Sequence, residues 1–453
     1  MYRKYAEEAM EIVRTIEADG ARLPGSAEEK AACKKLVGEM NERVGLKPRT
    51  ESFVFAPEAS IGAINKLGWV AMALLVLYYI GAPILSLIGY IGILVFTFMQ
   101  IVRYTGIWDF CFKKEKAENI ITELEPRNGK TDYTVYLGAH YDTSWCWKLA
   151  AMNPKTAMIK TGYGILCAVG MAVMSLFSIL NTFGVLEDAY VASIVLYVLP
   201  VAAIPGFFFI SHFLTQDKTI GSPGAMDNMS GIGLNMMVMK YFKEHPEEMP
   251  EGMKLVNIGF AAEESGLKGS FAYVKAHKDE FDKNNMYVLN VDSISDPGYF
   301  AAVKGDPWQG TKFDRGMIDM MKEAIGETGE KINEIVNPVG GCDSTPFCKV
   351  GVRTVTFAAQ MPTVSDYYHT NNDTSDRLSV EVFEKGFAVI VNTIKKIAAS
   401  RAVAKVEIVP EASAEAVSEA EVKAAPEAPA APEIIAAPEA PATSEAEAEK
   451  TEE

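Results

Sequence analysis

Residues 254–270 read KLVNIGFAAEESGLKGS, and the layout of this stretch governs the fold expected for the chain. An apolar run with the character of a strand ends in two adjacent acids, Glu263 and Glu264, and a small-residue turn leads into a helix. Neighbouring side chains of an extended chain point to opposite sides, so the two carboxylates cannot easily share one task. The stretch therefore predicts a buried strand that delivers two acids with separate duties to its carboxyl end.

Similar strand-like runs alternate with amphipathic helical patterns along the chain. The expected strands cover residues 119–125, 134–140, 254–262, 286–292 and 353–359. The expected helices cover residues 5–19, 27–44, 228–245, 268–278, 310–327 and 379–400. Strands that alternate with helices, several of them apolar throughout, predict an α/β fold with a mostly parallel central sheet flanked by helices. Ligands of such sheets bind beyond the carboxyl ends of the strands.

Polar side chains gather at those ends. They are His140 and Asp142 after the second expected strand, Asp227 at the start of a helix, Glu263 and Glu264, Asp292, and His369 before the last helix. Imidazoles and carboxylates without thiolates suit a zinc-like or manganese-like divalent ion. Asp227, Glu264 and Asp292 together carry −3, which two divalent ions and one hydroxide would neutralise. The charge count therefore favours two ions over one, because acids crowded without metal would be driven to protonate.

Two charge-free regions interrupt the α/β pattern. Residues 68–102 carry no charge, and neither do residues 161–186 and 189–216. The last two segments can each span a hydrocarbon core of roughly 30 Å, and the first region can hold two short spans around a Gly-Ala-Pro turn. We therefore expect two transmembrane helical hairpins, at 61–105 and 158–216, with four spans in all. A single tilted span with an interfacial arm is the alternative for the first region, and a buried soluble hairpin is disfavoured by the length of the second.

Basic residues flank the hairpins on one side. They are Lys66, Arg103, Lys113, Lys114, Lys116, Lys155, Lys160 and Lys218, while the opposite turns hold no Lys or Arg. Positive charge near membrane spans stays in the cytoplasm. The pattern predicts an integral, multi-pass membrane protein in the lipid bilayer, with its soluble part on the cytoplasmic side. The charged and amphipathic start, MYRKYAEEAMEIV, predicts no cleavable signal peptide.

The remaining boundaries follow from the hairpins. The α/β domain is expected in three parts, residues 1–60, 106–157 and 217–404, and residues 405–453 are expected to form a disordered Ala/Pro/Glu-rich acidic tail. From Val406 onward the chain holds 13 Glu and two Lys, a charge of −11, which leaves about −5 of the net −16 for everything before it. This mild charge predicts no nucleic-acid binding. Six cysteines without a C-x-x-C pair predict free thiols.

The motifs around the polar residues resemble those of the M28 family of zinc metallopeptidases, in an aminopeptidase-like, membrane-embedded form. They are GAHYDTS (138–144), GAMDNMSG (224–231), AAEESGLKGS (261–270), NVDSIS (290–295) and YHTNNDT (368–374), after a first match at GARLPGSAEEKAACKKL (20–36). Each motif alone is weak, but five in this order are specific. Ser344 departs from the pattern, because it stands where the family commonly has a His. The departure concerns contacts to substrate and not the expected metal ligands.

The resemblance implies two metal sites that share one ligand. His140 and Asp292 would bind one zinc, Glu264 and His369 would bind the other, and Asp227 would bridge the pair. The expected cofactors are two Zn²⁺ per chain, with other divalent ions as an alternative.

The resemblance also implies roles outside the metal ligands. Glu263 would act as general base on the water between the metals. Asp142 would orient His140 through the second nitrogen of its ring, as carboxylates behind metal ligands do. Tyr367 and Tyr368 could bind the tetrahedral intermediate, and packing alone is the competing interpretation.

The implied function is that of a membrane-anchored dinuclear zinc aminopeptidase, which hydrolyses N-terminal residues from peptides with a metal-bridged hydroxide and Glu263 as general base. The second hairpin leaves the domain beside His140 and Asp227, so we expect the cleft to lie close to the bilayer, with membrane-associated peptides among the substrates. Two alternatives remain open: a glutaminyl cyclase-like acyltransferase with one zinc, and a non-catalytic receptor or scaffold on the same fold.

Overall fold

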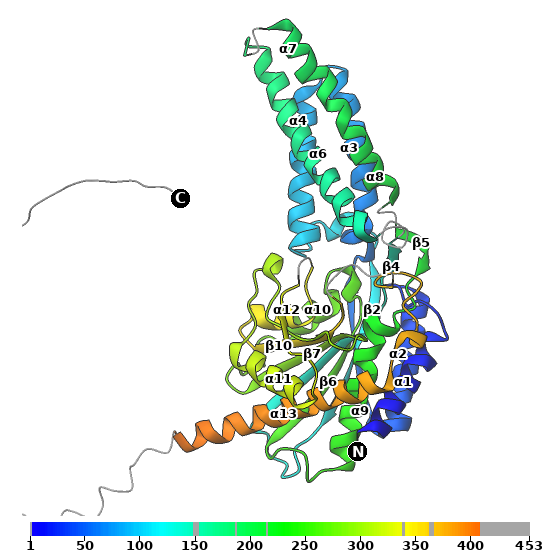
Figure 1. The fold of residues 1–453 in the computed structure, drawn as a ribbon, viewed down its shortest axis with the longest axis vertical. Helices are drawn as coiled ribbons and strands as arrows, with labels where there is room; N and C mark the ends of the chain where they lie inside the picture. The colour runs from blue at the N-terminus through cyan, green and yellow to red at the C-terminus, as the bar shows by residue number, and fades with distance from the viewer. Residues whose placement is uncertain are drawn as a thin grey trace, which may run out of the picture. The chain divides into compact units, whose positions relative to one another are not determined.

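The computed structural model describes residues 2–147, 154–185, 188–213, 216–337, 340–361 and 367–407. It contains a large sheet with helices on both faces and a bundle of apolar helices, α3, α4, α6 and α8, that stand side by side (Figure 1). The last helix extends to Glu407, and the rest of the predicted acidic tail lies outside the described residues.

The main sheet has eight strands in the order β1-β2-β6-β3-β7-β10-β8-β9. The bounds are β1 Arg49–Phe55, β2 Glu115–Leu124, β3 Tyr133–His140, β6 Met253–Phe260, β7 Met286–Ile294, β8 Phe300–Val303, β9 Asn333–Ile335 and β10 Arg353–Ala359. Strands β6, β3, β7 and β10 are parallel, whereas β1, β2 and β8 pair antiparallel with their inner neighbours. The predicted α/β fold is confirmed, with a parallel centre and antiparallel flanks.

Strand β3 shows why the centre is parallel. All eight of its residues are buried, as expected of a strand covered by helices on both faces. Val135, Leu137 and Ala139 join the larger apolar core, while Tyr136 joins a smaller core on the opposite face. The larger core packs against α1 Arg3–Glu17, α2 Ala27–Glu39, α9 Ser230–Glu244, α11 Arg315–Glu327 and α13 Val380–Glu407. The smaller core packs against α10 Lys268–His277 and α12 Ser344–Lys349.

Two predicted helices begin later than expected. Helix α9 starts at Ser230 because Asp227 and Asn228 have non-helical backbone angles. Helix α11 starts at Arg315 because the side chain of Asp314 accepts the N–H of Met317 at 2.9 Å and so caps the helix.

The predicted hairpins are helical. The first consists of α3 Ile64–Tyr79 and α4 Pro83–Phe96, which continues to Val102 as a π-helical segment. The second consists of α6 Pro154–Asn181 and a return arm that runs from α7 Ala189–Ser193 to α8 Ala203–Phe213. By length and composition, three described helical stretches can cross a membrane: Pro83–Val102, Ile159–Asn181 and Tyr190–Ser211. Four spans were expected, with the two of the first hairpin short; helix α3, with 16 residues, is shorter than these three stretches, so three of the four have the length of a span.

The return arm of the second hairpin is interrupted near Pro200, between a π-helical turn and a 3-10 turn. Proline has no N–H to donate to the carbonyl of Leu196, four residues before it. The hydroxyl of Tyr78 on α3 donates to that carbonyl at 2.8 Å, and the hydroxyl of Tyr79 donates to the carbonyl of Tyr197 at 2.9 Å. The first hairpin therefore satisfies backbone groups that the break in the second one releases.

A two-stranded sheet, β4 Trp145–Trp147 and β5 Gln216–Gly221, lies where the second hairpin leaves and re-enters the α/β part. Cys33, Cys111, Cys342 and Cys348 carry free thiols, as predicted.

Candidate metal centre and active site

The five predicted ligands lie together beyond the carboxyl ends of the parallel strands. His140 ends β3, Asp292 lies near the end of β7, and Glu264 sits in the turn after β6. Asp227 precedes α9, and its carboxylate lies between the two imidazoles. Its Oδ1 is 3.1 Å from His140 Nε2, and its Oδ2 is 3.1 Å from His369 Nε2.

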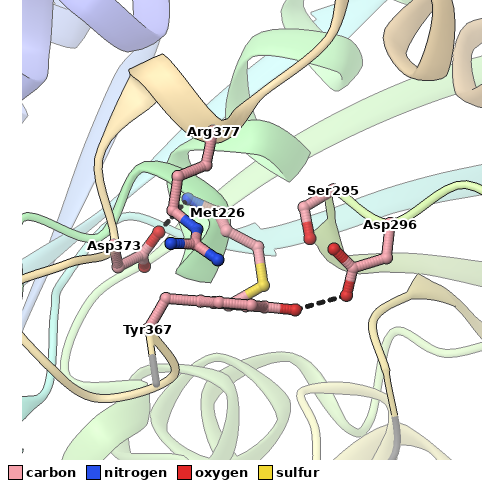
Figure 2. A pocket seen from close by; sticks show the side chains of 6 residues that line it. All are labelled: Met226, Ser295, Asp296, Tyr367, Asp373 and Arg377. Atoms are coloured by element: carbon pink, nitrogen blue, oxygen red, sulfur yellow. Dashed lines mark hydrogen bonds between the residues drawn. The ribbon is translucent and has the colours of Figure 1, made fainter. Parts of the chain in front are cut away.

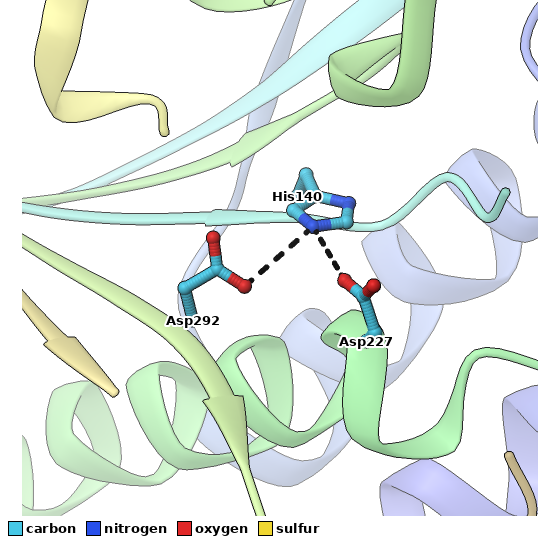
Figure 3. Close-up of side chains that lie close together, drawn as sticks. All are labelled: His140, Asp227 and Asp292. Carbon is cyan, nitrogen blue, oxygen red and sulfur yellow. Dashed lines mark ion pairs between the residues drawn. The ribbon is translucent and has the colours of Figure 1, made fainter. Parts of the chain in front are cut away.

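These side chains form two groups of three that share Asp227. One group is His140, Asp227 and Asp292 (Figure 3), and the other is Asp227, Glu264 and His369; within each group the potential ligand atoms lie within 4.8 Å of one another. Glu264 Oε1 is 3.2 Å from His369 Nε2, and Asp292 Oδ1 is 3.9 Å from His140 Nε2. Nitrogen and carboxylate oxygen donors at this spacing fit two divalent cations on either side of Asp227.

Burial gives the acids of this centre unequal proton affinities. It raises the pKa of Asp292 to about 6, even though His140 acts in the opposite direction. Burial also raises the pKa of Asp227, but the hydrogen bonds from His140 and His369 lower it by more than burial raises it. The net pKa of Asp227 therefore lies below the usual range. Burial and the neighbouring acid Glu264 raise the pKa of Glu263 well above its ordinary value. Such a crowded set of buried carboxylates favours a bound cation, which would remove their mutual repulsion.

Asp142 holds the turn Glu263–Ser265 that follows β6, called the acidic turn below. Its two carboxylate oxygens accept the backbone N–H groups of Glu263 and Glu264, each at 3.0 Å. His140 Nδ1 lies farther from it, at 3.5 Å from Oδ1 and 3.3 Å from the backbone oxygen of Asp142. The Asp142 carboxylate therefore lies near His140, as the sequence suggested, but at a distance longer than a typical hydrogen bond. Its shorter hydrogen bonds go to the backbone of Glu263 and Glu264.

Two further side chains continue this clamp along the turn. The N–H of Ala262 donates to Glu29 Oε1 at 3.1 Å, and the N–H of Ala261 donates to Asn119 Oδ1 at 3.1 Å. Glu29 is fully buried and accepts the N–H of Gly25 with its other oxygen at 2.7 Å. Ala262 has a φ of 56°, a left-handed conformation that is uncommon without glycine. Buried acceptors therefore hold the backbone where the strand turns sharply into the two glutamates.

Asp373 and Arg22 hold the loop that carries Asp227. Asp373 accepts the N–H of Met226 at 2.7 Å and that of Asp227 at 3.1 Å. Burial, with Asp227 nearby, raises the pKa of Asp373 to about 7. The buried guanidinium of Arg22 donates to the carbonyls of Pro223 and Gly224, at 2.8 and 3.0 Å. Neither residue was singled out from the sequence, although both lie in motifs that were, 20–36 and 368–374.

A cavity of about 210 Å³ lies beside this loop, and Met226, Ser295, Asp296, Tyr367, Asp373 and Arg377 line it (Figure 2). Tyr367 donates a short hydrogen bond to Asp296, and the Arg377 guanidinium carbon lies 4.3 Å from the centre of the Tyr367 ring. Tyr368 instead stacks on His369, with ring centres 3.9 Å apart. These contacts support the packing interpretation for Tyr367 and place Tyr368 against a candidate ligand.

The stretch around Ser344, which departs from the family pattern, contains a buried acid, Asp343. The hydroxyl of Ser344 lies 2.9 Å from Thr356 Oγ1 on β10, so it faces the sheet. Neither carboxylate oxygen of Asp343 has a hydrogen-bond partner in the described part of the chain, and burial raises its pKa to about 7 despite the opposing effect of His140. Sequence reasoning passed over Asp343 because its neighbours come from distant strands.

Known proteins resemble this chain in sequence and in fold. The model of peptidase family M28 matches residues 206–394. Aminopeptidase YwaD of Bacillus subtilis is 24% identical over 195 residues, a match that covers 40% of this chain and 40% of that protein. Among solved structures, the zinc aminopeptidase BSAP from Bacillus subtilis superimposes with a TM-score of 0.51 at 14% identity, over 86% of this chain and 95% of that one. A glutaminyl cyclase from Porphyromonas gingivalis gives a TM-score of 0.49 at 13% identity, over 86% and 98% of the two chains.

The likeness to BSAP shows the shared α/β fold, and the family model covers the segment that carries Asp227, Glu263, Glu264, Asp292 and His369. Residues 206–394 of this chain thus resemble peptidase family M28.

Proposed function

We propose that this chain is a membrane-anchored dinuclear zinc aminopeptidase that removes N-terminal residues from peptides. The observation that carries the proposal is the pair of three-residue groups that share Asp227 and lie next to Glu263. His140 and Asp292 would hold one zinc, Glu264 and His369 the other, and Asp227 both. Zinc bound there would lower the pKa of a water molecule and polarise the scissile carbonyl of a peptide.

Glu263 is suited to move the proton in this reaction. Its backbone is fixed by Asp142, and its side chain is the acid of the turn that belongs to neither group of candidate ligands. Its carboxylate would accept a proton from the attacking water and return it to the leaving amine, a contribution typically worth about 10²–10⁴-fold. Glu264, one residue on, would remain a ligand, so the turn separates the two duties that adjacent acids could not share.

The decisive test is the zinc-dependent release of amino acids from aminoacyl amides and short peptides. Glu263→Gln should lower kcat by about 10²–10⁴-fold while the zinc content stays that of the wild type. Glu251→Gln, an exposed acid before the same strand, is the matched control and should be fully active. Undiminished hydrolysis in Glu263→Gln would reject the proposed role.

The two groups also distinguish the proposal from its alternatives. A glutaminyl cyclase-like enzyme with one zinc needs one group of metal ligands, whereas this site offers two such groups. A receptor or scaffold needs neither group, and all five candidate ligands are present here. Near one zinc per chain, together with ring closure of an N-terminal Gln, would instead support the cyclase.

The apolar bundle supports membrane anchoring. Its outward side chains are apolar and exposed, for example Val76 on α3, Ile88 on α4 and Leu166 on α6, at 60%, 62% and 65% exposure. Such a surface is expected of helices that face lipid. We place the soluble part in the cytoplasm because of the basic residues near the bundle's base, and we expect membrane-associated peptides among the substrates.

A further inference from the structure

The chain segment that leaves the first hairpin is docked on the α/β part at several points. The carbonyl of Val102, the last residue of the helical stretch, accepts a hydrogen bond from Gln309 Nε2 at 2.6 Å. Seven residues later, Asp109 pairs with Lys268 Nζ at 2.8 Å, and Lys268 lies just beyond the acidic turn. Residues 103–108 are therefore held across that turn.

The segment that enters the same hairpin also touches the acidic turn. The hydroxyl of Ser265 donates to the carbonyl of Pro57 at 3.1 Å. A Cβ placed on Gly266 would lie 3.3 Å from the hydroxyl of Ser60, which is buried. Both arms of the first hairpin thus have their base against the turn that presents Glu263 and Glu264.

Tyr104 projects from the departing arm into this region. A Cβ on Gly266 would lie 3.0 Å from Tyr104 Cδ1, and a Cβ on Gly340 would lie 3.3 Å from Tyr104 Oη. The ring therefore packs against Gly266 at the end of the acidic turn, and the hydroxyl ends beside Gly340, in the loop that leads to Asp343. The φ of Tyr104 is 52°, a left-handed conformation that is costly for a side chain of this size.

The hydroxyl of Tyr104 makes no hydrogen bond to any residue that the structure describes. Burial raises the pKa of Tyr104, and the carboxylates of Glu263, Glu264 and Asp306 raise it further, so the phenol stays protonated and neutral. Its surroundings are rich in carboxylates, which accept hydrogen bonds. A peptide bound here presents main-chain carbonyl oxygens, which also accept and need a donor.

We propose that Tyr104 is a substrate-binding residue supplied by the first membrane hairpin, and that its hydroxyl donates a hydrogen bond to a main-chain carbonyl of a peptide held beside Glu263. This inference rests on the proposed peptidase function. It makes the hairpin part of the substrate site, so the soluble part alone has an incomplete site.

Tyr104→Phe removes the hydroxyl and keeps the ring, so kcat/KM for short peptides should fall by about 3- to 10-fold, the change expected for one neutral hydrogen bond. Zinc content and the thermal melting temperature should not change. Tyr79→Phe, a tyrosine of the same hairpin whose hydroxyl bonds within the bundle, is the matched control and should keep the wild-type kcat/KM. Equal rates for Tyr104→Phe and the control would overturn the inference while the peptidase function stands.

A binding measurement separates this inference from the proposed reaction. Calorimetry on the full-length Glu263→Gln protein, with and without Tyr104→Phe, would report the Kd of a short peptide without turnover. The double variant should bind the peptide about 3- to 10-fold more weakly. Weaker binding in a protein whose wild type hydrolyses nothing would support Tyr104 and overturn the peptidase function. A wild type that neither binds nor hydrolyses peptides would overturn both.

Discussion

Three consecutive backbone N–H groups of the acidic turn are held by only two buried carboxylates. Glu29 accepts from Ala262, and Asp142 accepts from Glu263 and Glu264. In a buried site each of these hydrogen bonds avoids an unsatisfied donor. The positions of Glu263, the proposed general base, and of Glu264, a candidate ligand, therefore depend on two acids that belong to neither candidate metal group.

We expect Glu29→Gln to disturb the turn, because the amide offers one acceptor where the carboxylate offers two. An N–H group would lose its partner, which costs about 1–3 kcal/mol in the free energy of unfolding, and kcat should fall at full zinc loading. Urea unfolding and peptide hydrolysis measure the two effects. Glu28→Gln is the matched control, because Glu28 is the exposed neighbour. Identical behaviour of the two variants would contradict the role given to Glu29.

The candidate ligands could be named from the sequence because each lies in a recognisable motif at the end of an expected element. The side chains that hold them could not. Glu29 acts on a backbone group 233 residues away, and Asp373 acts on one 147 residues away, at Met226. The hydrophobic periodicity of the sequence cannot predict such contacts, because they depend on how the sheet brings distant loops together.

At the scale of elements, long apolar strands were predictable and short ones were not. All five expected strands are present, within a few residues of their predicted ends. Strands β8 and β9 have four and three residues, and their pairing with neighbours, not an internal pattern, makes them strands. The helical hairpins followed from apolar length, whereas the break at Pro200 and the tyrosines that compensate for it needed the structure.

Tyr78→Phe should destabilise the bundle by about 0.5–1.5 kcal/mol, because the Leu196 carbonyl loses its donor. Pro200→Ala supplies a backbone N–H four residues after Leu196. The double variant Tyr78→Phe/Pro200→Ala should therefore lose less stability than Tyr78→Phe alone. Denaturation of the purified protein in detergent micelles would give both differences. Additive losses in the double variant would show that the hydroxyl does not compensate for the proline.

His277 joins helix α10 to the edge strand β1. Its Nε2 lies 2.9 Å from Glu51, and its Nδ1 lies 3.0 Å from Glu280. Burial lowers the pKa of His277, but the hydrogen bonds to the two glutamates raise it more, so the net pKa lies above the ordinary value of 6.5. A raised pKa in the folded state stabilises the protein fully below about pH 6.5, and this stabilisation is lost as the pH rises through the folded value.

His277→Gln should therefore lower the free energy of unfolding at pH 6, by less than about 1 kcal/mol because the pair is partly exposed. At pH 9 the same substitution should have little effect. Urea titrations of both proteins at the two pH values measure the difference. A loss of the same size at both would mean that the histidine stabilises by packing and not by charge.

At the scale of the whole molecule, the hairpins are insertions into an α/β fold shared with the zinc aminopeptidase BSAP, and they reach back to the candidate metal centre. The first enters and leaves beside the acidic turn, and the second leaves after β4 and returns through β5 to the loop that carries Asp227. The sequence indicated both insertions through their apolar length. It could not indicate that Tyr104 lies over Gly266, because that contact joins residues with no shared pattern.

The proposed orientation places the base of the hairpins in the cytoplasm and the turn between α6 and α7 on the other side. In single-cysteine variants, the native and exposed Cys111 should react with a membrane-impermeant maleimide only after the cells are permeabilised. A Gly184→Cys variant, at the far turn, should react in intact cells. The reverse pattern would place the peptidase site outside the cytoplasm.

The central claim is that two divalent cations are bound on either side of Asp227. The most direct measurement is the zinc-to-protein ratio of the purified, full-length chain after dialysis, determined by elemental analysis. The predicted ratio is near two, with both ions lost in Asp227→Asn because both groups share that carboxylate. A ratio near one, or no zinc at all, would contradict it.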